Sequence, residues 1–171
     1  GPAGADGPAG PPGPAGAAAL FSGAATLSGV AASTQLGGWD MSAPFYDSPG
    51  FDETSGTYTV PQTGYYDLSL SCNIDMPAAV TASVGGEPAL AIRNITTGTD
   101  LAKGRISMLS VDLVLLLVLR APVLGQVQAN GIVEVSAGDQ VGAFYQADGL
   151  SLALDLEDCR FSATRLGGPG P

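Results

Sequence analysis

Residues 64–75 read GYYDLSLSCNID and alternate without a break between two kinds of side chain. The even positions from 66 to 74 hold tyrosine, leucine, leucine, cysteine and isoleucine, whereas the odd positions hold Tyr65 followed by small polar residues. A period of two residues is typical of a β-strand that turns one face to a core. The pattern therefore predicts a long strand whose even positions are buried and whose odd positions face solvent or another subunit.

Shorter segments of the same kind lie on both sides of this strand. GTYTVP (56–61) predicts a short strand ended by proline, and GIVEVSAGDQVGAFYQ (131–146) predicts two strands around a tight turn at residues 137–139. LSLALDL (150–156) and CRFSATRL (159–166) are expected to form the last two strands. Residues 19–171 contain no helical period of useful length, so the chain is predicted to be an all-β antiparallel sandwich or jelly roll.

The most apolar run is VDLVLLLVL, residues 111–119. Nine residues that include Asp112 and end before Arg120 are too few to cross a bilayer as a helix, which needs about 20. We therefore expect no membrane insertion, and the run is interpreted as one buried strand.

The first eighteen residues follow a different rule, with glycine at every third position and prolines between: Gly1, Gly4, Gly7, Gly10, Gly13 and Gly16. This is the signature of a collagen triple helix, because only glycine fits at its crowded axis. The alternative is a flexible Gly/Pro/Ala linker. Six triplets would make a helix roughly 55 Å long, too short to hold three chains together, so we expect the remaining residues to do so.

The sequence therefore divides into four parts. Residues 1–18 are a collagen-like segment, expected to be the end of a longer stalk. Residues 19–36 are the neck and first strand, residues 37–166 the head, and residues 167–171 a flexible tail.

Three strings in the head resemble the complement component 1q / tumour necrosis factor superfamily: TYTVPQTGYYDLSLS (57–71), VEVSAGDQVGAFYQ (133–146) and CRFSATRL (159–166). Heads of that superfamily share a Thr-Val-Pro…Thr-Gly-Tyr-Tyr segment, here residues 59–66, a Gly-Asp-x-Val turn, here 138–141, and a closing Phe-Ser strand, here 161–162. A collagen-like segment before such a head strengthens the resemblance. The Ala/Leu/Val-rich middle is most similar to collagen-like glycoproteins of bacterial spore surfaces, the exosporium.

The resemblance implies a ten-stranded jelly roll that forms a threefold homotrimer around its inner sheets. Tyr65 would then lie in the trimer interface, with Phe144 on the next inner strand. The resemblance also makes the strands of Cys72 and Cys159 neighbours, close enough for a disulfide. Both cysteines fall on the apparent core faces of their strands, and we favour two separate buried thiols over a disulfide.

Composition excludes several classes of function. The chain has no histidine, which rules out Cys-His and Ser-His-Asp catalysis and zinc sites that use histidine. The neighbouring acids Asp52-Glu53 and Glu157-Asp158 are interpreted as solvated surface, so we expect no enzyme. The net charge of −10 and six scattered basic residues argue against nucleic-acid binding.

The loop over residues 37–56 carries the remaining candidates. We expect its aromatic residues to close one end of the sandwich; the alternative is that Trp39, Tyr46 and Phe51 contact a ligand. No cofactor is required. Oxygen ligands suit calcium, for which the weak candidates are Asp40, Asp47 and Asp52, although no EF-hand spacing is present and ordinary acidic loops are favoured.

These observations lead to a structural role. We expect an extracellular protein on a cell, spore or virion surface whose head trimerises and starts the triple helix of its stalk, with other surface or coat proteins as further partners. The alternative is a trimeric recognition module that binds a glycan, receptor or protein through its outer loops.

Overall fold

The structure is a computed structural model that describes residues 1, 4, 19–75, 86–113, 117–122, 125–150 and 153–168, of which 109–113 and 117–122 are described by their backbone. The regular elements of the described residues are all β-strands. They are β1 (Leu20–Val30), β2 (Thr34–Gln35), β3 (Phe51–Asp52), β4 (Thr57–Thr59), β5 (Gly64–Asp75), β6 (Ala89–Asn94), β7 (Thr99–Arg105), β8 (Met108–Leu113), β9 (Leu117–Pro122), β10 (Gly125–Val135), β11 (Gln140–Gln146) and β12 (Leu154–Gly167).

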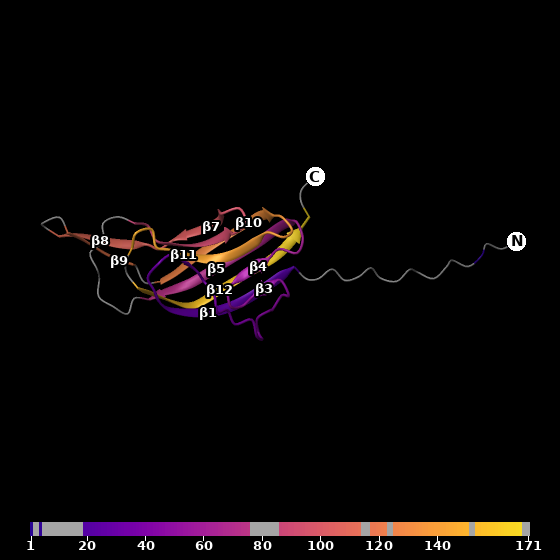
Figure 1. Ribbon diagram of the computed structural model, residues 1–171, viewed down its shortest axis with the longest axis horizontal. Coiled ribbons are helices and arrows are strands. Elements are labelled where there is room, and N and C mark those ends of the chain that lie inside the picture. The colour runs from indigo at the N-terminus through magenta and orange to yellow at the C-terminus, as the bar shows by residue number, and fades with distance from the viewer. Residues whose placement is uncertain are drawn as a thin grey trace.

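Ten of these strands form two antiparallel sheets that pack into a sandwich (Figure 1). The four-stranded sheet has the order β1-β12-β5-β10. The six-stranded sheet has the order β3-β4-β11-β6-β7, with β2 paired to β11 beside β4. The predicted all-β, ten-stranded jelly-roll sandwich is confirmed. Within the described residues, no helix has the length and apolar character needed to cross a membrane.

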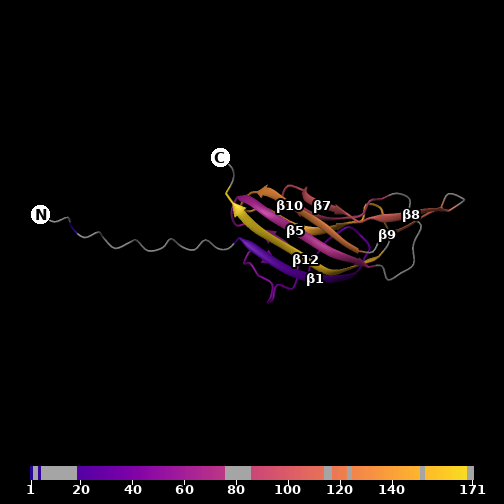
Figure 2. The same ribbon diagram turned by 180° about the vertical axis from the view of Figure 1, so that it is seen from behind.

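The two ends of the sandwich differ. β1 begins beside the end of β12, where Leu20 pairs with Thr164, so the chain enters and leaves the head at one end. Strands β8 and β9 form a separate two-stranded sheet that lies beyond the opposite end in both views (Figures 1 and 2). We call the first the stalk end and the second the far end.

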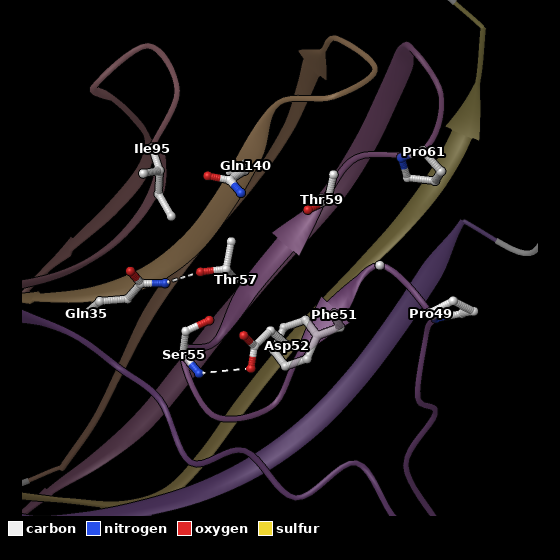
Figure 3. Close-up of a pocket in the computed structure, with 11 residues that line it drawn as sticks. Gln35, Pro49, Phe51, Asp52, Ser55, Thr57, Thr59, Pro61, Ile95 and Gln140 are labelled. Carbon is white, nitrogen blue, oxygen red and sulfur yellow. Dashed lines mark hydrogen bonds between the residues drawn. The ribbon is translucent and has the colours of Figure 1, made fainter.

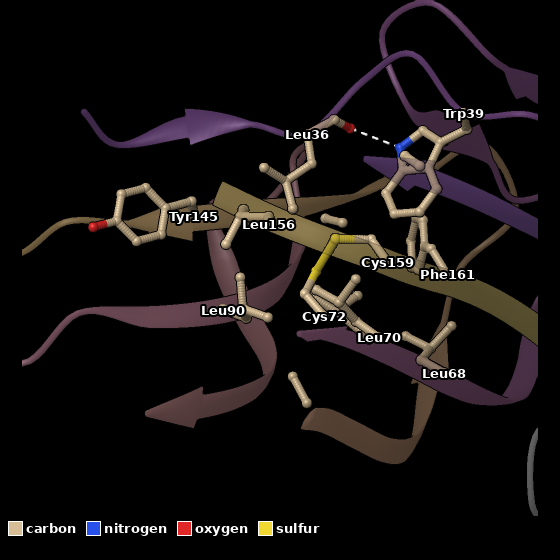
Figure 4. Close-up of a cluster of buried hydrophobic side chains, with 14 of the residues drawn as sticks. Leu36, Trp39, Leu68, Leu70, Cys72, Leu90, Tyr145, Leu156, Cys159 and Phe161 are labelled. Carbon is tan, nitrogen blue, oxygen red and sulfur yellow. Dashed lines mark hydrogen bonds between the residues drawn. A yellow bond between two sulfur atoms is a disulfide. The ribbon is translucent and has the colours of Figure 1, made fainter. Parts of the chain in front are cut away.

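Strand β5 shows the predicted alternation, because its even positions from 66 to 74 are at most 3% exposed. The core between the sheets also holds large aromatic residues from several strands, among them Phe21, Tyr58 and Phe161. The rings of Phe21 and Phe161 meet edge to face with centroids 4.9 Å apart. Aliphatic and aromatic side chains from both sheets thus share one hydrophobic core (Figure 4).

Cys72 and Cys159 form a disulfide inside this core, so the expectation of two free thiols is wrong (Figure 4). Strands β5 and β12 are neighbours. Glu157 pairs with Asn73 and Arg160 pairs with Ser71, which leaves two residues of β12 opposite Cys72. One of these two is Cys159, and this bulge in β12 therefore brings the two cysteines together.

The last part of the chain is one strand rather than the predicted two. β12 continues through residues 157–160 because the bulge holds the extra residue that interrupts the alternation of apolar and polar side chains. Asp158 lies in this bulge and has a φ of 46°. Both halves of β12 pair with β1 and β5, so the irregular Glu-Asp pair does not end the strand.

The run VDLVLLLVL is not one buried strand. It is divided between β8 and β9, which pair with each other from Met108↔Pro122 to Leu113↔Leu117. Its length fits a hairpin as well as a strand, because residues 114–116, which lie outside the described residues, are enough to connect the two halves.

The predicted collagen-like segment falls mostly outside the described residues. Gly1 and Gly4 are described, and a Cβ built on either would meet nothing within 4 Å. Gly7, Gly10, Gly13 and Gly16, together with residues 169–171 of the tail, lie outside the description. The triple helix stays a prediction.

Candidate functional site

The strongest candidate for a functional surface is the side of the four-stranded sheet that faces away from the core, which we call the open face. It carries the odd positions of β5 and the even positions of β10. From β12 it carries positions 155 and 157 before the bulge and positions 160, 162 and 164 after it, together with the residues of β1 that pair with them. Register aligns these side chains in rows across the strands, and the rows change in character from the stalk end to the far end.

The stalk end of the open face carries exposed apolar residues beside two exposed acids, since Asp67 pairs with Ile132 and Glu134 pairs with Tyr65. Among the described large apolar side chains, four are more than one third exposed, and three of them lie here: Tyr65 at 38%, Ile132 at 64% and Leu166 at 57%. Ile132 pairs with Asp67, one row from Tyr65, and diagonal neighbours of this kind are about 7–8 Å apart. Leu166 occupies a bulge between Arg165 and Gly167, whose partners are Tyr66 and Tyr65.

The middle of the open face is polar. One row across all four strands consists of Ser22, Ser162, Ser69 and Asn130. The Ser69 hydroxyl donates a 2.9 Å hydrogen bond to Asn130 Oδ1, and Asn130 Nδ2 donates a 3.3 Å bond to Gln128 Oε1. Gln128 Nε2 donates in turn to Gln126 Oε1 at 2.7 Å, so an amide network follows β10. Short side chains in this row allow another molecule to approach closely.

The far end of the open face is acidic. Asp75 pairs with Asp155 across β5 and β12, and Glu157 pairs with Asn73 in the next row. The nearest basic residue along β12 is Arg160, whose guanidinium carbon lies 5.2 Å from the centroid of the Phe45 ring. The exposed large apolar residues of this face are therefore gathered at its stalk end, whereas acidic residues lie at both ends.

Phe144 does not lie on this face, so the expectation that it sits on the next strand of the inner sheet is wrong. It belongs to β11, which pairs with β2, β4 and β6 in the six-stranded sheet. Its neighbours Ala143 and Tyr145 are buried, and Phe144 is half-buried on the opposite side beneath Arg93, 5.6 Å from the ring centroid. Tyr65 remains the predicted interface residue.

Two of the three aromatic candidates for ligand contact belong to the core. Trp39 is 2% exposed and its Nε1 donates a 2.8 Å hydrogen bond to the Leu36 carbonyl oxygen (Figure 4). Phe51 is 8% exposed and stacks near Phe21 with ring centroids 4.4 Å apart. Trp39 and Phe51 are therefore core residues, and Tyr46 is the exposed one, at 46%. That the loop closes one end of the sandwich stays a prediction.

A groove of about 800 Å³ lies on the outer side of the six-stranded sheet (Figure 3). Gln35 Nε2 donates a 2.9 Å hydrogen bond to Thr57 Oγ1 in its floor. Asp52 accepts hydrogen bonds from the backbone of Ser55 and Thr54, which lower the pKa of its carboxyl group, so this acceptor stays ionised. Other residues that line the groove are Thr59, Gln140, Pro49, Pro61 and Ile95. The groove thus offers hydroxyl, amide and carboxylate groups between apolar patches.

The calcium candidates do not come together. Asp40 accepts hydrogen bonds from the hydroxyl and the backbone N–H of Ser42, which lower the pKa of its carboxyl group. The Asp52 carboxylate accepts its bonds from the backbone of Thr54 and Ser55. Across the described ranges, no three acidic or cysteine side chains are placed to share a metal ion. Asp40, Asp47 and Asp52 therefore do not form a joint site.

No family model matches the chain, and no curated protein matches its sequence. Among solved structures, it is similar to Eiger TNF from S. frugiperda, with a TM-score of 0.57 and 12% identity over 91% of this chain and 96% of that chain. It is also similar to the globular domain of zebrafish complement 1qA protein, with a TM-score of 0.53 and 13% identity over 88% of this chain and 98% of that chain. The fold is therefore that of a complement 1q/TNF-like head.

Sequence reasoning found Tyr65 but missed Ile132 and Leu166. A signal for Ile132 was present, because in GQVQANGIVEV (125–135) the even positions are polar except for this isoleucine. A lone apolar residue on a polar face indicates contact with something outside the protomer. Leu166 had no such signal, since its exposure follows from the bulge at the end of β12.

Proposed function

We propose that this domain is a trimerisation head that holds three chains together through the exposed apolar residues at the stalk ends of their open faces. The observation that carries the proposal is the grouping of Tyr65, Ile132 and Leu166 at the stalk end, where the chain enters β1. Exposed large apolar residues that cluster on one face are typical of an interaction surface. The complement 1q/TNF-like fold supports a threefold arrangement.

The proposed interface lies at the end of the head where the Gly-X-Y segment is attached, which suggests how assembly would serve the stalk. Each Gly-X-Y segment joins the head at Ala19, beside β12, so packing at this end brings three segments to one place. Tethering raises their effective concentration to about the millimolar range and fixes their mutual register. A triple helix then starts at the head and extends toward the N-terminus, and the head does not depend on the stalk for its own assembly.

Light scattering tests this proposal on the intact chain, which is expected to have three times the 17.0 kDa mass of one chain. The Ile132→Glu variant is expected to be monomeric and folded, because residue 132 is 64% exposed and contributes little to the core. Tyr46→Glu is the matched control, since it adds the same charge at another exposed apolar residue and should remain a trimer. A trimeric Ile132→Glu protein would contradict the assigned interface.

We further propose that the head is extracellular and not an enzyme. A buried disulfide between Cys72 and Cys159 fits an oxidising compartment. The expected setting is a cell, spore or virion surface, with other surface or coat proteins as additional partners. Fractionation of the source cells or particles, with an antibody to the head, tests the location.

A second candidate function is recognition of a saccharide in the groove on the six-stranded sheet. The supporting observation is its mixture of hydroxyl, amide and ionised carboxylate groups, which suits the hydroxyls of sugars. Three grooves per trimer would increase binding through avidity. A glycan array probed with the intact protein is expected to give hits that Gln140→Ala removes and Tyr46→Ala leaves unchanged. Absence of hits, or hits unaffected by Gln140→Ala, would reject this site.

A further inference from the structure

The hairpin of β8 and β9 contacts the core of the sandwich at its first residue, Met108, and pairs with neither large sheet in the described residues. It contains the most apolar run of the chain. Figures 1 and 2 both place it beyond the far end of the sandwich. The hairpin therefore carries apolar positions away from the core of its own protomer.

Register divides the hairpin into two unlike faces. Positions 109, 111 and 113 pair with 121, 119 and 117, and all six are leucine, valine or alanine. Positions 108, 110 and 112 pair with 122, 120 and 118, so the other face is mixed. It holds Ser110, Asp112 and Arg120 together with Met108, Val118 and Pro122. We call the first set the apolar hairpin face. A division of this kind is typical of a β-ribbon that is covered on one side.

An isolated two-stranded ribbon is marginally stable in water, and three or more strands with a hydrophobic face are needed for independent stability. The hairpin thus requires a partner for its apolar face. A partner must reach the far end of the head, since the hairpin lies there.

Continuity along the chain points to the other copies of this protein. β9 is separated from β10 by residues 123 and 124 only, and β10 contributes Ile132 and the Gln126–Asn130 network to the open face. A threefold axis along the open faces therefore brings three hairpins to the same end of the assembly. Asp112 and Arg120 occupy register positions on the opposite face of the ribbon.

We propose that the apolar faces of three β8–β9 hairpins pack against one another and close the far end of the trimer as a six-stranded cap. This proposal rests on the threefold assembly proposed above. The cap adds an apolar contact at the end where the open face is acidic, so the two ends of the assembly are both held by apolar residues.

Cysteine cross-linking in the intact protein tests the cap. Leu119→Cys places a thiol on the apolar hairpin face, and Val118→Cys places one on the other face as the matched control. Treated with a short bis-maleimide at micromolar protein, the 119 variant is expected to give roughly tenfold more cross-linked chains, because proximity raises the effective thiol concentration. The native cysteines do not interfere, since both are buried in a disulfide.

The outcomes separate the two proposals. A protein that is trimeric by light scattering but cross-links equally at 118 and 119 overturns the cap and leaves the stalk-end interface intact. A monomeric protein overturns both. Flotation with phosphatidylcholine vesicles tests whether lipid, and not another copy of the chain, covers the apolar hairpin face. If the wild-type protein floats with the vesicles and the Leu119→Lys variant does not, lipid covers this face and the proposed cap is wrong. The expected result is no flotation and a Leu119→Lys trimer that dissociates at higher concentration than the Val118→Lys trimer.

Discussion

At the scale of single residues, the disulfide shows how a pairing distant in sequence depends on the local backbone. Cys72 and Cys159 are 87 residues apart and both lie on core faces. They meet because β12 carries two residues opposite Cys72, where a regular ladder would carry one. The alternating pattern predicted that both cysteines are buried, but the bulge that brings them together was not visible in it.

Removal of the disulfide is expected to destabilise the head without changing its fold. Replacing both cysteines by alanine releases a long loop in the unfolded chain and should lower the free energy of unfolding by about 2–5 kcal/mol. Denaturant titration of the wild type and the double variant measures the difference. Titration of both in the presence of a reductant is the control, and a difference that persists under full reduction would mean that packing, and not the bond, is responsible.

Three buried tyrosines make the stability depend on alkaline pH. Burial raises the pKa of Tyr58, Tyr66 and Tyr145 above the ordinary value of 10.0. The unfolded chain releases these protons from about pH 10, whereas the folded chain retains them, so stability is complete below pH 10 and falls as the pH rises. Denaturant titrations at pH 9 and pH 11 should show this loss.

Tyr145→Phe supplies the control for that effect. The Tyr145 hydroxyl is buried and has no hydrogen-bond partner in the described part of the chain, so its removal is expected to cost little at pH 7. The variant should lose less stability than the wild type between pH 9 and pH 11. An identical loss in both proteins would assign the alkaline effect to other groups.

At the scale of elements, the two sheets meet closely where β7 crosses β10. Gly104 on β7 lies against the backbone of β10, and a Cβ at this position would overlap the carbonyl oxygen of Gln128. Gly131 on β10 has more room, because its added Cβ would find the nearest atom, Ala102 Cβ, at 3.8 Å. The two glycines therefore form a matched pair of close and open sites.

Gly104→Ala is expected to lower the free energy of unfolding by roughly 1–3 kcal/mol, since backbone must move to admit the methyl group. Gly131→Ala should be neutral or stabilise the head by about 0.4–1 kcal/mol through the unfolded chain. Thermal and denaturant unfolding of both variants checks the difference. Equal effects at the two positions would contradict the close approach of β7 and β10.

The elements that sequence analysis misjudged are those whose limits depend on their neighbours. The Glu157-Asp158 pair looks like a break between strands, but β1 and β5 support β12 on both sides and keep it continuous through the bulge. The run at 111–119 is apolar throughout, and periodicity alone does not distinguish one buried strand from a hairpin. Strand 64–75 was predicted correctly because one of its faces is buried along its whole length.

At the scale of the whole molecule, charge opposes the proposed assembly. Each chain has a net charge of −10, and acidic residues occupy the far end of the open face. We therefore expect the trimer to be held by apolar contacts against electrostatic repulsion. Salt screens such repulsion, with a Debye length of about 30 Å at 0.01 M and about 10 Å at 0.1 M.

Raising the salt concentration should consequently strengthen the trimer. Sedimentation equilibrium at 0.01 M and 0.1 M salt is expected to give tighter association at the higher concentration. An interface built on opposite charges would behave in the reverse way and weaken with salt. A weaker trimer at 0.1 M would thus contradict the apolar interface, while leaving the fold unaffected.

The sequence by itself determined the β class of the head, the buried face of β5 and the burial of both cysteines, because each follows from local alternation along one strand. Its motifs also pointed to the complement 1q/TNF-like fold. Only the tertiary structure decided that Phe144 lies in the other sheet, that the cysteines are bonded, that Ile132 and Leu166 join Tyr65 at the stalk end, and that the apolar run leaves the sandwich as a hairpin. These features depend on which strands are neighbours and in what register. Neighbours and register arise from contacts between residues far apart in the chain, which no local pattern contains.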